Sequence, residues 1–283
     1  MGQVAGVAVV AVGVLAGCGD DRPVTAAAGV TVAPARLPFG SPVEMHFVFE
    51  RTAEPVALAG PYRVFVHFTD PDGVRLWGDD HDPPVPVDAW RPGEPVAWTR
   101  AFFLPRVPYV GPVEVRAGLY DPATGARLRL EADPVGADAY RLATFAVTAQ
   151  THPLDFVDGW HQAEPTGGDP PEEWRWSSGT GTLEFINPGE DVTLHLVVER
   201  NVELPEPQTV RILLGDQVLD EFELPTGERL WRRVAIPADA FGDAMVQTLS
   251  VAADRTFVPA EAGLGADTRE LGVSVFHAVL LDQ

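Results

Sequence analysis

The side chains best suited to bind a ligand gather in one Pro- and Gly-rich segment after residue 150. They are Trp160, Glu172, Glu173, Trp174, Arg175 and Trp176. Indole rings stack on the apolar faces of sugar rings, while carboxylate and guanidinium groups hydrogen-bond to hydroxyls. This segment is therefore a candidate carbohydrate-binding site. The alternative is structural, because a tryptophan in a β-sandwich commonly closes the core between the sheets, and Arg175–Trp176 would then pin the N-terminal segment.

The other tryptophans are expected to have structural roles. Trp231 shares a strand face with Arg229 and Arg233, which predicts a solvent-facing ring held by a cation–π contact. An equally open interpretation is that Trp231 covers a sheet edge. The remaining three are expected in the core or at the rim of the first domain: Trp77, Trp90 and Trp98.

Carboxylates beside the tryptophans raise the question of catalysis. Glycoside hydrolysis needs two carboxylates that face each other across a cleft, and Glu164 could join Glu172 or Glu173 in such a pair. With 41 acidic residues in the chain, such neighbours also arise by chance. No Gly-x-Ser-x-Gly motif is present, and the serines near this segment have no histidine close by in sequence. The sequence therefore favours a non-catalytic protein, with a hydrolase as an alternative.

A second polar group lies between residues 67 and 82. His67 and the run Asp79-Asp80-His81-Asp82 could gather as metal ligands, because imidazole and carboxylate both suit divalent ions. We favour a structural cluster in which a histidine hydrogen-bonds a nearby aspartate. Asp70 and Asp72 flank a glycine-containing turn but lack the other ligands of a calcium loop. We therefore predict neither a metal site nor a cofactor.

The charge of the chain excludes one class of partner. The formal net charge is −21, with 41 acidic and 20 basic residues, and every basic residue is arginine. Nucleic-acid binding depends on cationic neutralisation of phosphates, so a nucleic-acid partner is not expected. Without lysine, Schiff-base chemistry is also excluded.

The N-terminus predicts export and a lipid anchor. An apolar run from Val4 to Leu15 is too short to span a bilayer and matches the core of a secretory signal. The sequence Leu15-Ala16-Gly17-Cys18 resembles the lipobox of bacterial lipoproteins. That resemblance implies a signal peptide over residues 1–17, a lipid on Cys18, and a protein anchored to a membrane facing the periplasm or the cell surface. Met1-Gly2-Gln3 lacks the usual positive charge, which suggests a true start upstream.

The elements that would carry these side chains are strands. Apolar residues alternate with other residues over 62–68, 113–119 and 192–198, which indicates strands with one buried face. Asp70–Gly73, Asp121–Gly125 and Gly215–Asp216 have the residues of tight turns. Pro237–Phe241 could be one helical turn, and nothing longer is implied.

These patterns predict an all-β protein of two tandem antiparallel β-sandwich domains, Ig-like or jelly-roll-like. The first is expected over residues 35–150 and the second over 151–283, where the strand pattern lapses into the Pro/Gly-rich segment and then resumes. Residues 18–34 are small and polar and are expected to form a spacer between the lipid and the first domain.

Two resemblances suggest a glycan context. The motifs in the first domain are Val64–Phe68, Asp70–Gly73, Asp80-His81, Trp90–Glu94 and Gly118–Pro122. They resemble an uncharacterised β-sandwich domain at the extracytoplasmic ends of bacterial membrane glycosyltransferases. Gly159-Trp160, Glu164, Arg175-Trp176 and Asp267–Gly272 are similar to a sandwich module found near cell-surface polysaccharide enzymes. The resemblance implies a compartment and a glycan context, and no reaction.

The sequence thus favours a lipid-anchored, non-catalytic binding protein of the cell envelope in a surface glycan context. A first alternative is a scaffold that binds a membrane protein, such as a glycosyltransferase, through a sheet face. A second alternative is a glycan hydrolase.

Overall fold

The computed structural model describes residues 22–52, 58, 60–167, 172–200, 202 and 207–283. These residues form strands, turns and two short 3-10 helices, so the predicted all-β class is confirmed. No helix among them is long and apolar enough to cross a membrane. Cys18, the expected signal peptide and the first residues of the expected spacer lie outside the described residues.

The N-terminal strands form a two-sheet sandwich, called the N-terminal sandwich below. One sheet has the order β6-β3-β1-β8 and the other β2-β10-β7-β4-β5, with β9 paired to β10. Most pairs are antiparallel, but β1 with β8 and β2 with β10 are parallel. The elements are β1 (Ala26–Ala33), β2 (Arg36–Pro38), β3 (Pro42–Arg51), β4 (Arg63–Thr69), β5 (Arg75–Gly78), η1 (Val87–Ala89), β6 (Val96–Phe103), β7 (Gly111–Tyr120), β8 (Leu130–Glu131), β9 (Asp133–Gly136) and β10 (Ala139–Thr148).

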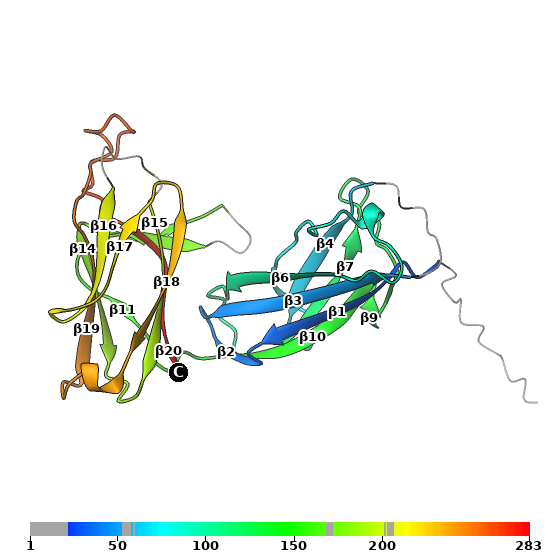
Figure 1. The fold of residues 1–283 in the computed structure, drawn as a ribbon, viewed down its shortest axis with the longest axis horizontal. Helices are drawn as coiled ribbons and strands as arrows, with labels where there is room; N and C mark the ends of the chain where they lie inside the picture. The colour runs from blue at the N-terminus through cyan, green and yellow to red at the C-terminus, as the bar shows by residue number, and fades with distance from the viewer. Residues whose placement is uncertain (1–21, 53–57, 59, 168–171, 201, 203–206) are drawn as a thin grey trace, which may run out of the picture.

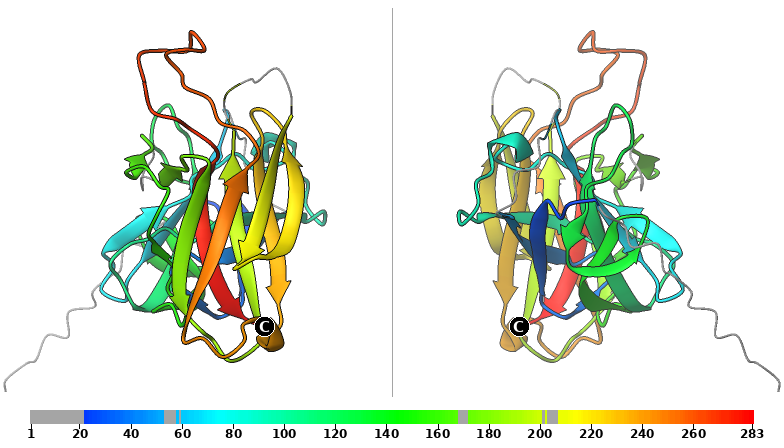
Figure 2. Two further views of the ribbon diagram at one scale, coloured as in Figure 1. Left: turned by 90° about the vertical axis from the view of Figure 1, so that its left-hand side faces the viewer. Right: turned by 90° about the vertical axis from the view of Figure 1, so that its right-hand side faces the viewer.

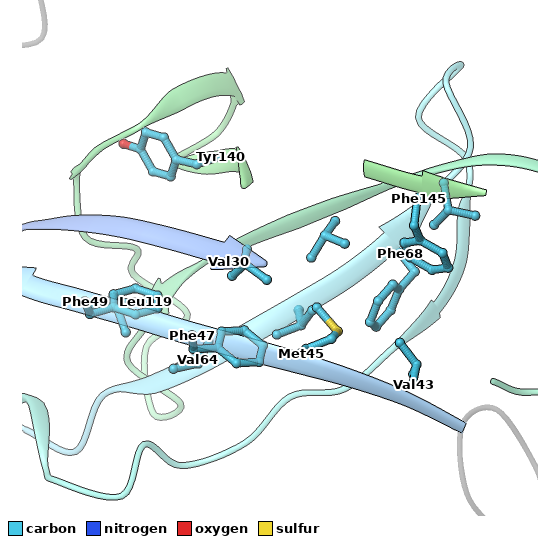
Figure 3. Close-up of a cluster of buried hydrophobic side chains, with 14 of the residues drawn as sticks. Val30, Val43, Met45, Phe47, Phe49, Val64, Phe68, Leu119, Tyr140 and Phe145 are labelled. Atoms are coloured by element: carbon cyan, nitrogen blue, oxygen red, sulfur yellow. The ribbon is translucent and has the colours of Figure 1, made fainter. Parts of the chain in front are cut away.

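The core of this sandwich is formed by strands in which buried apolar residues alternate with exposed residues. On β3, Met45, Phe47 and Phe49 are fully buried while the residues between them are exposed or nearly so. They meet Val64 and Phe68 of β4 and Leu119 of β7 between the two sheets, as Figure 3 shows. Burial of large apolar side chains at about 1.5–3 kcal/mol each is the main stabilising contribution here.

The prediction of a spacer over residues 18–34 is wrong for its C-terminal part, because residues 26–33 form a strand. They form β1, which pairs with β3 over its whole length, from Ala26 with Arg51 to Ala33 with Glu44. Ala26 and Val30 face the core. The small residues that suggested a spacer still alternate with period two, and the full hydrogen-bonded ladder with β3 makes them a strand.

The C-terminal strands form a second pair of sheets, called the C-terminal sandwich below. One sheet has the order β11-β14-β19-β16-β17 and the other β12-β13-β20-β15-β18. Its core is a separate cluster that includes Leu183, Leu194, Ile212 and Leu249. The elements are β11 (Asp155–Phe156), β12 (Glu164–Pro165), β13 (Glu173–Trp176), β14 (Thr180–Ile186), β15 (Val192–Glu199), β16 (Gln208–Leu214), β17 (Gln217–Leu224), β18 (Arg229–Ile236), η2 (Ala238–Ala240), β19 (Val246–Ala253) and β20 (Ser274–Asp282).

Turn chemistry matches the sequence predictions. The Gly73 amide donates to the Asp70 carbonyl at 3.0 Å, and the Asp121 carboxylate accepts hydrogen bonds from Ala123 and Thr124. Gly215, at φ +55°, begins the two-residue connection between β16 and β17. The helical turn predicted after Pro237 is η2.

The two sheets of the C-terminal sandwich differ in what covers them. In Figure 1 the sheet with β15, β18 and β20 faces the N-terminal sandwich. The left view of Figure 2 presents the other sheet, with β16, β17 and β19, on the side away from that sandwich. Phe103 at the end of β6 contacts Trp231 of β18 and His277 of β20, so the two sandwiches touch.

Candidate functional site

A cavity of about 390 Å³ lies where the two sandwiches meet, and we call it the inter-sandwich cavity. The N-terminal sandwich contributes β5, the end of β6 and the loop that follows it. The C-terminal sandwich contributes β11, β13, the residue before β13 and β20. The lining residues are Trp77, Gly78, Asp79, Phe102, Phe103, Pro105, Arg106, Val107, Pro108, Phe156, Glu172, Glu173, Trp174, Arg175, Val275, Phe276 and His277.

Aromatic rings form much of the wall. Trp174 stacks on Phe276 with ring centroids 5.7 Å apart and an interplanar angle of 26°. Phe103 stacks on His277 at 4.4 Å and 12°. A register shift in β20 pairs Val275 with Val198 and His277 with Val197, which leaves Phe276 as an extra residue. This β-bulge lets the consecutive residues Phe276 and His277 both line the cavity.

Glu172 is held as a carboxylate. His277 donates from Nε2 to Oε1 at 3.1 Å, and Arg229 donates from Nη1 to Oε2 at 2.8 Å. Arg229 also bonds Glu199 at 2.9 Å and lies 3.8 Å over the Phe276 ring. The hydrogen bond from His277, and then those from Arg229, outweigh desolvation and lower the pKa of Glu172 to about 2. Glu172 is therefore an ionised acceptor at neutral pH.

The carboxylate of Asp79, which the N-terminal sandwich contributes to the cavity, is also paired with an arginine. Arg100 donates to both of its carboxylate oxygens, at 3.0 and 2.5 Å. A bidentate arginine pair of this kind fixes the carboxylate geometrically. The cavity thus contains two carboxylates whose charge is balanced by protein groups.

The polar group around residue 81 is hydrogen-bonded within the protein. His81 Nδ1 lies 2.8 Å from the Asp79 carbonyl, while His81 Nε2 accepts from Trp98 Nε1 at 3.1 Å. Burial lowers the pKa of His81, in agreement with a neutral ring that donates from one nitrogen and accepts at the other. The Asp80 carboxylate accepts from the Val66 amide, and Asp82 accepts from Arg63. These hydrogen bonds tie His81, Asp80 and Asp82 to groups on β4 and β6.

A different trio has ligand atoms close together. His152, Glu190 and Asp282 place theirs within 4.8 Å of one another, and His152 Nε2 lies 2.7 Å from Asp282. Sequence reasoning did not single out these residues, because they are far apart in the chain and no spacing pattern links them.

The six predicted ligand-binding residues divide into two groups. Glu172, Glu173, Trp174 and Arg175 line the inter-sandwich cavity. Trp160 and Trp176 do not: Trp160 donates from Nε1 to the Thr182 carbonyl at 2.7 Å and packs edge-on against Phe156. Trp176 is only 5% exposed and packs against Phe257 and Leu271. Both rings are engaged by protein contacts outside the cavity, so the segment does not present one continuous aromatic platform.

The remaining tryptophans agree with their predicted roles. Trp77 and Trp90 are buried, and Trp98 lies partly buried against Phe47 and Phe49. Trp231 is 38% exposed, with Arg233 lying 5.8 Å from its ring centroid. Its Nε1 also donates to His195 Nδ1 at 3.2 Å, a contact that the sequence did not suggest.

Glu164 lies outside the cavity lining. Its carboxylate pairs with Arg269 at 2.8 Å, and Arg269 also binds Asp267. The carboxylate pair imagined from the sequence, Glu164 with Glu172 or Glu173 across one cleft, is therefore not assembled around the inter-sandwich cavity.

Sequence patterns singled out only four of the cavity-lining residues as ligand-binding candidates, Glu172 to Arg175. Phe103, Arg106, Phe276 and His277 line the cavity, yet they lie more than 65 residues from Trp174 in the chain. One weak signal was present, since Phe102-Phe103 interrupts alternation at the end of β6 and predicts an additional buried surface there.

No protein-family model matches this chain, and no curated protein matches it. It is similar at low identity to several solved structures. A family GH115 4-O-methyl-α-glucuronidase with specificity for decorated arabinogalactans is 11% identical, with 56% of this chain and 20% of that chain covered and a TM-score of 0.33. SGBP-B from a xyloglucan utilization locus in Bacteroides uniformis is 11% identical, with 92% and 74% covered and a TM-score of 0.32. The C-terminal CBM6 of LamC from Zobellia galactanivorans is 9% identical, with 47% and 100% covered and a TM-score of 0.27. This chain spans 20% of the length of the glucuronidase, and the similarities assign it to no family.

Proposed function

We propose that this chain is a lipid-anchored protein of the cell envelope that binds a surface glycan, without catalysis, in the inter-sandwich cavity. The observation that carries the proposal is the placement of Trp174 beside Phe276 in a cavity that also holds charged hydrogen-bonding groups. Apolar rings with a few fixed polar groups are the usual composition of a small-ligand site.

The size of the cavity fits a short stretch of glycan. Its volume of about 390 Å³ lies toward the small end of the range for ligand sites, about 300–1,000 Å³. A site of this volume suits one or two sugar rings of a longer chain. The exposed fraction of Glu172, 38%, leaves its carboxylate accessible to hydroxyl groups of a ligand.

The non-catalytic part of the proposal rests on Glu172. A general acid must carry a proton at the working pH, and a carboxyl group with a pKa of about 2 does not at neutral pH. Glu164, the other candidate, is paired with Arg269 outside the cavity. Glu172 is thus better suited to accept hydrogen bonds from a ligand than to act as a general acid.

The binding proposal is tested by Trp174→Ala in the purified full chain in detergent, titrated calorimetrically against a panel of envelope polysaccharides. Loss of a stacking ring is expected to weaken binding about 10-fold or more. The matched control is Phe222→Ala, which removes another half-buried aromatic ring, on β17, outside the cavity lining. If Trp174→Ala keeps wild-type affinity, or if no polysaccharide binds, the proposal fails.

The anchor is tested separately, by fractionation of cells that express Cys18→Ser. The substitution removes the thiol that would accept the lipid, so the protein should leave the membrane fraction. Trp174→Ala should stay in the membrane fraction and serves as the control. Unchanged fractionation of Cys18→Ser, with processing at another position, would contradict the anchor.

A second candidate, a scaffold for a membrane protein, is favoured by one apolar patch. Ile186, Met245 and Val246 are all strongly exposed, and Ile186 pairs with Val246 at the ends of β14 and β19. If the scaffold is the correct function, Val246→Ser with Met245→Ser should abolish co-purification of a membrane glycosyltransferase. Glycan affinity should then be unaffected, because these residues lie outside the cavity lining.

A further inference from the structure

Arg106 and Arg175 line the inter-sandwich cavity and differ from the two other arginines near it, Arg100 and Arg229. Arg100 and Arg229 each bind a carboxylate. Among the described residues, no carboxylate lies within ion-pair distance of Arg106 or Arg175, although both line the cavity. The chain as a whole has a net charge of −21, so two such guanidinium groups beside one cavity are a local concentration of positive charge.

Each of these arginines is placed by its surroundings. Arg175 lies 5.2 Å from the Phe156 ring centroid, and its Nη1 is 3.5 Å from the His161 carbonyl. Arg106 follows Pro105 in a loop stiffened by a hydrogen bond of 2.9 Å from the Val107 amide to the Pro105 carbonyl. The two Arg175 contacts use only part of its five-donor guanidinium group, and the loop hydrogen bond beside Arg106 is made by the backbone and uses none of the Arg106 side-chain donors.

The two arginines are close enough to influence each other. Removal from water lowers the pKa of Arg106, nearby Glu173 opposes this, and Arg175 lowers it further. Arg100 pairs with Asp79, and Arg229 is shared between Glu172 and Glu199, while His277 donates a hydrogen bond to Glu172. The lining charges outside these ion pairs are the two guanidinium groups of Arg106 and Arg175 and the carboxylate of Glu173, and this local excess of one cation favours an anion in the cavity.

We propose, building on the proposed function, that the glycan bound in this cavity is acidic, with the oxyanion of a uronate or sulfate group held between Arg106 and Arg175 while its ring lies against Trp174. Guanidinium groups bind carboxylates and sulfates through short charge-assisted hydrogen bonds, which are stronger than bonds between neutral groups. With a neutral sugar bound, neither guanidinium group would have an anionic partner within ion-pair distance among the described residues.

The test is calorimetric titration of the full chain in detergent with trigalacturonate, a sulfated galactotriose and neutral galactotriose. Arg106→Gln and Arg175→Gln should each weaken binding of an acidic trisaccharide by about 10-fold or more, and affinity for galactotriose should change less than about 2-fold. Whichever acidic probe binds tighter identifies the oxyanion. Binding of that probe should also weaken as salt is raised.

The matched control is Arg91→Gln, which removes one exposed arginine from a loop outside the cavity lining and should leave every affinity unchanged. Arg106→Lys and Arg175→Lys keep the charge and should lose less affinity than the glutamine variants. Thermal melts identify a variant that fails to fold, and the lysine variant then decides.

The outcomes separate the two proposals. If neutral and acidic trisaccharides bind equally, and only Trp174→Ala weakens them, selection for an acidic sugar is wrong and glycan binding stands. If the acidic probes fail to bind while a neutral polysaccharide binds, the selection is likewise overturned. If nothing binds, both proposals fail.

Discussion

The outer faces of the two sheets in the C-terminal sandwich have opposite character. On the sheet with β14 and β19, the outward residues near the middle of the strands, such as Thr182, Thr248 and Ser250, are small, polar and partly exposed, and the apolar Ile186 and Val246 lie exposed at the strand ends. On the sheet with β15 and β20, the outward positions include His195, Val197 and Val279, which are buried. Figure 1 shows that this second sheet faces the N-terminal sandwich. We call the two surfaces the open face and the covered face.

The difference teaches where a binding site forms in this protein. The open face has the ordinary alternation of a half-buried sheet, with no aromatic ring among the outward residues of β14 and β19. The covered face has aromatic rings and ion pairs over strands that are buried on both sides, and it contributes Phe276 and His277 to the cavity. Contact with a second sandwich converts a sheet surface into a partly enclosed, aromatic site.

The largest effect is expected for Trp176→Ala, in β13 of the sheet that carries the covered face. Trp176 packs against Phe257 and Leu271, so its truncation should lower the free energy of unfolding by about 3–5 kcal/mol. Denaturant unfolding followed by tryptophan fluorescence measures this change. A loss below about 1 kcal/mol would show that the ring is not part of a packed core.

The stability of the fold should also fall at acid pH because of His195, a buried residue of the covered face. Burial, and secondarily Arg233, lowers the pKa of His195 to about 4, so the neutral ring that accepts from Trp231 is the folded form. The folded protein binds fewer protons than the unfolded chain between pH 6.5 and 4. Stability from this group is therefore complete above pH 6.5 and declines as the pH falls toward 4, by on the order of 3 kcal/mol.

His195→Gln should remove this part of the pH dependence, because glutamine does not titrate and its amide oxygen can accept from Trp231. The measurement is the free energy of unfolding at pH 7 and pH 4.5 for both proteins. His46→Gln, on an exposed position of the N-terminal sandwich, is the control and should keep the wild-type slope. An unchanged slope in His195→Gln would contradict the assignment.

A smaller effect is expected for Glu172→Gln. The pKa of Glu172 is lowered to about 2 by His277 and Arg229, so the carboxylate stabilises the fold above its unfolded pKa of about 4.3, and this stability is lost as the pH falls toward 2. Because the side chain is 38% exposed, solvent screening limits the contribution to about 1 kcal/mol. The variant should be less stable than wild type at pH 7 and nearly equal to it at pH 2.5. A constant difference at both pH values would show that the ionised form is not responsible.

The smallest effect is expected on the open face. Ser250→Ala removes one partly exposed hydroxyl and should change the free energy of unfolding by less than about 0.5 kcal/mol, with glycan affinity unchanged. The same unfolding and titration measurements apply. Weaker glycan binding in this variant would place the site on the open face and reverse the comparison.

Local patterns were sufficient to predict much of the fold. The alternations of β4, β7 and β15 and the turns at Asp70–Gly73 and Gly215–Asp216 were all predicted. They depend on neighbours in the chain, whose spacing is set covalently. Composition alone gives the wrong prediction at β1, because small residues such as Ala26 and Gly29 are also typical of a spacer. Only the ladder to β3 shows their role.

The candidate site was predicted in part, for the same reason. Residues 172–175 were singled out by their types, and they do line the cavity. The spacing of the three tryptophans does not predict their different environments, because each environment depends on residues distant in the chain. Trp160 contacts Thr182 and Phe156, Trp174 stacks on Phe276, and Trp176 packs against Phe257 and Leu271.

The sequence by itself determined the strands, their turns, the acidic charge and the presence of a polar, aromatic segment after residue 150, since each is a property of short stretches of chain. The tertiary structure alone decided that Trp174 and Arg175 meet Phe103 and Arg106 around one cavity. The physical reason is that this meeting requires two sheets to dock. Docking is set by the summed shape and burial of surfaces built from distant segments, and no local pattern encodes that sum.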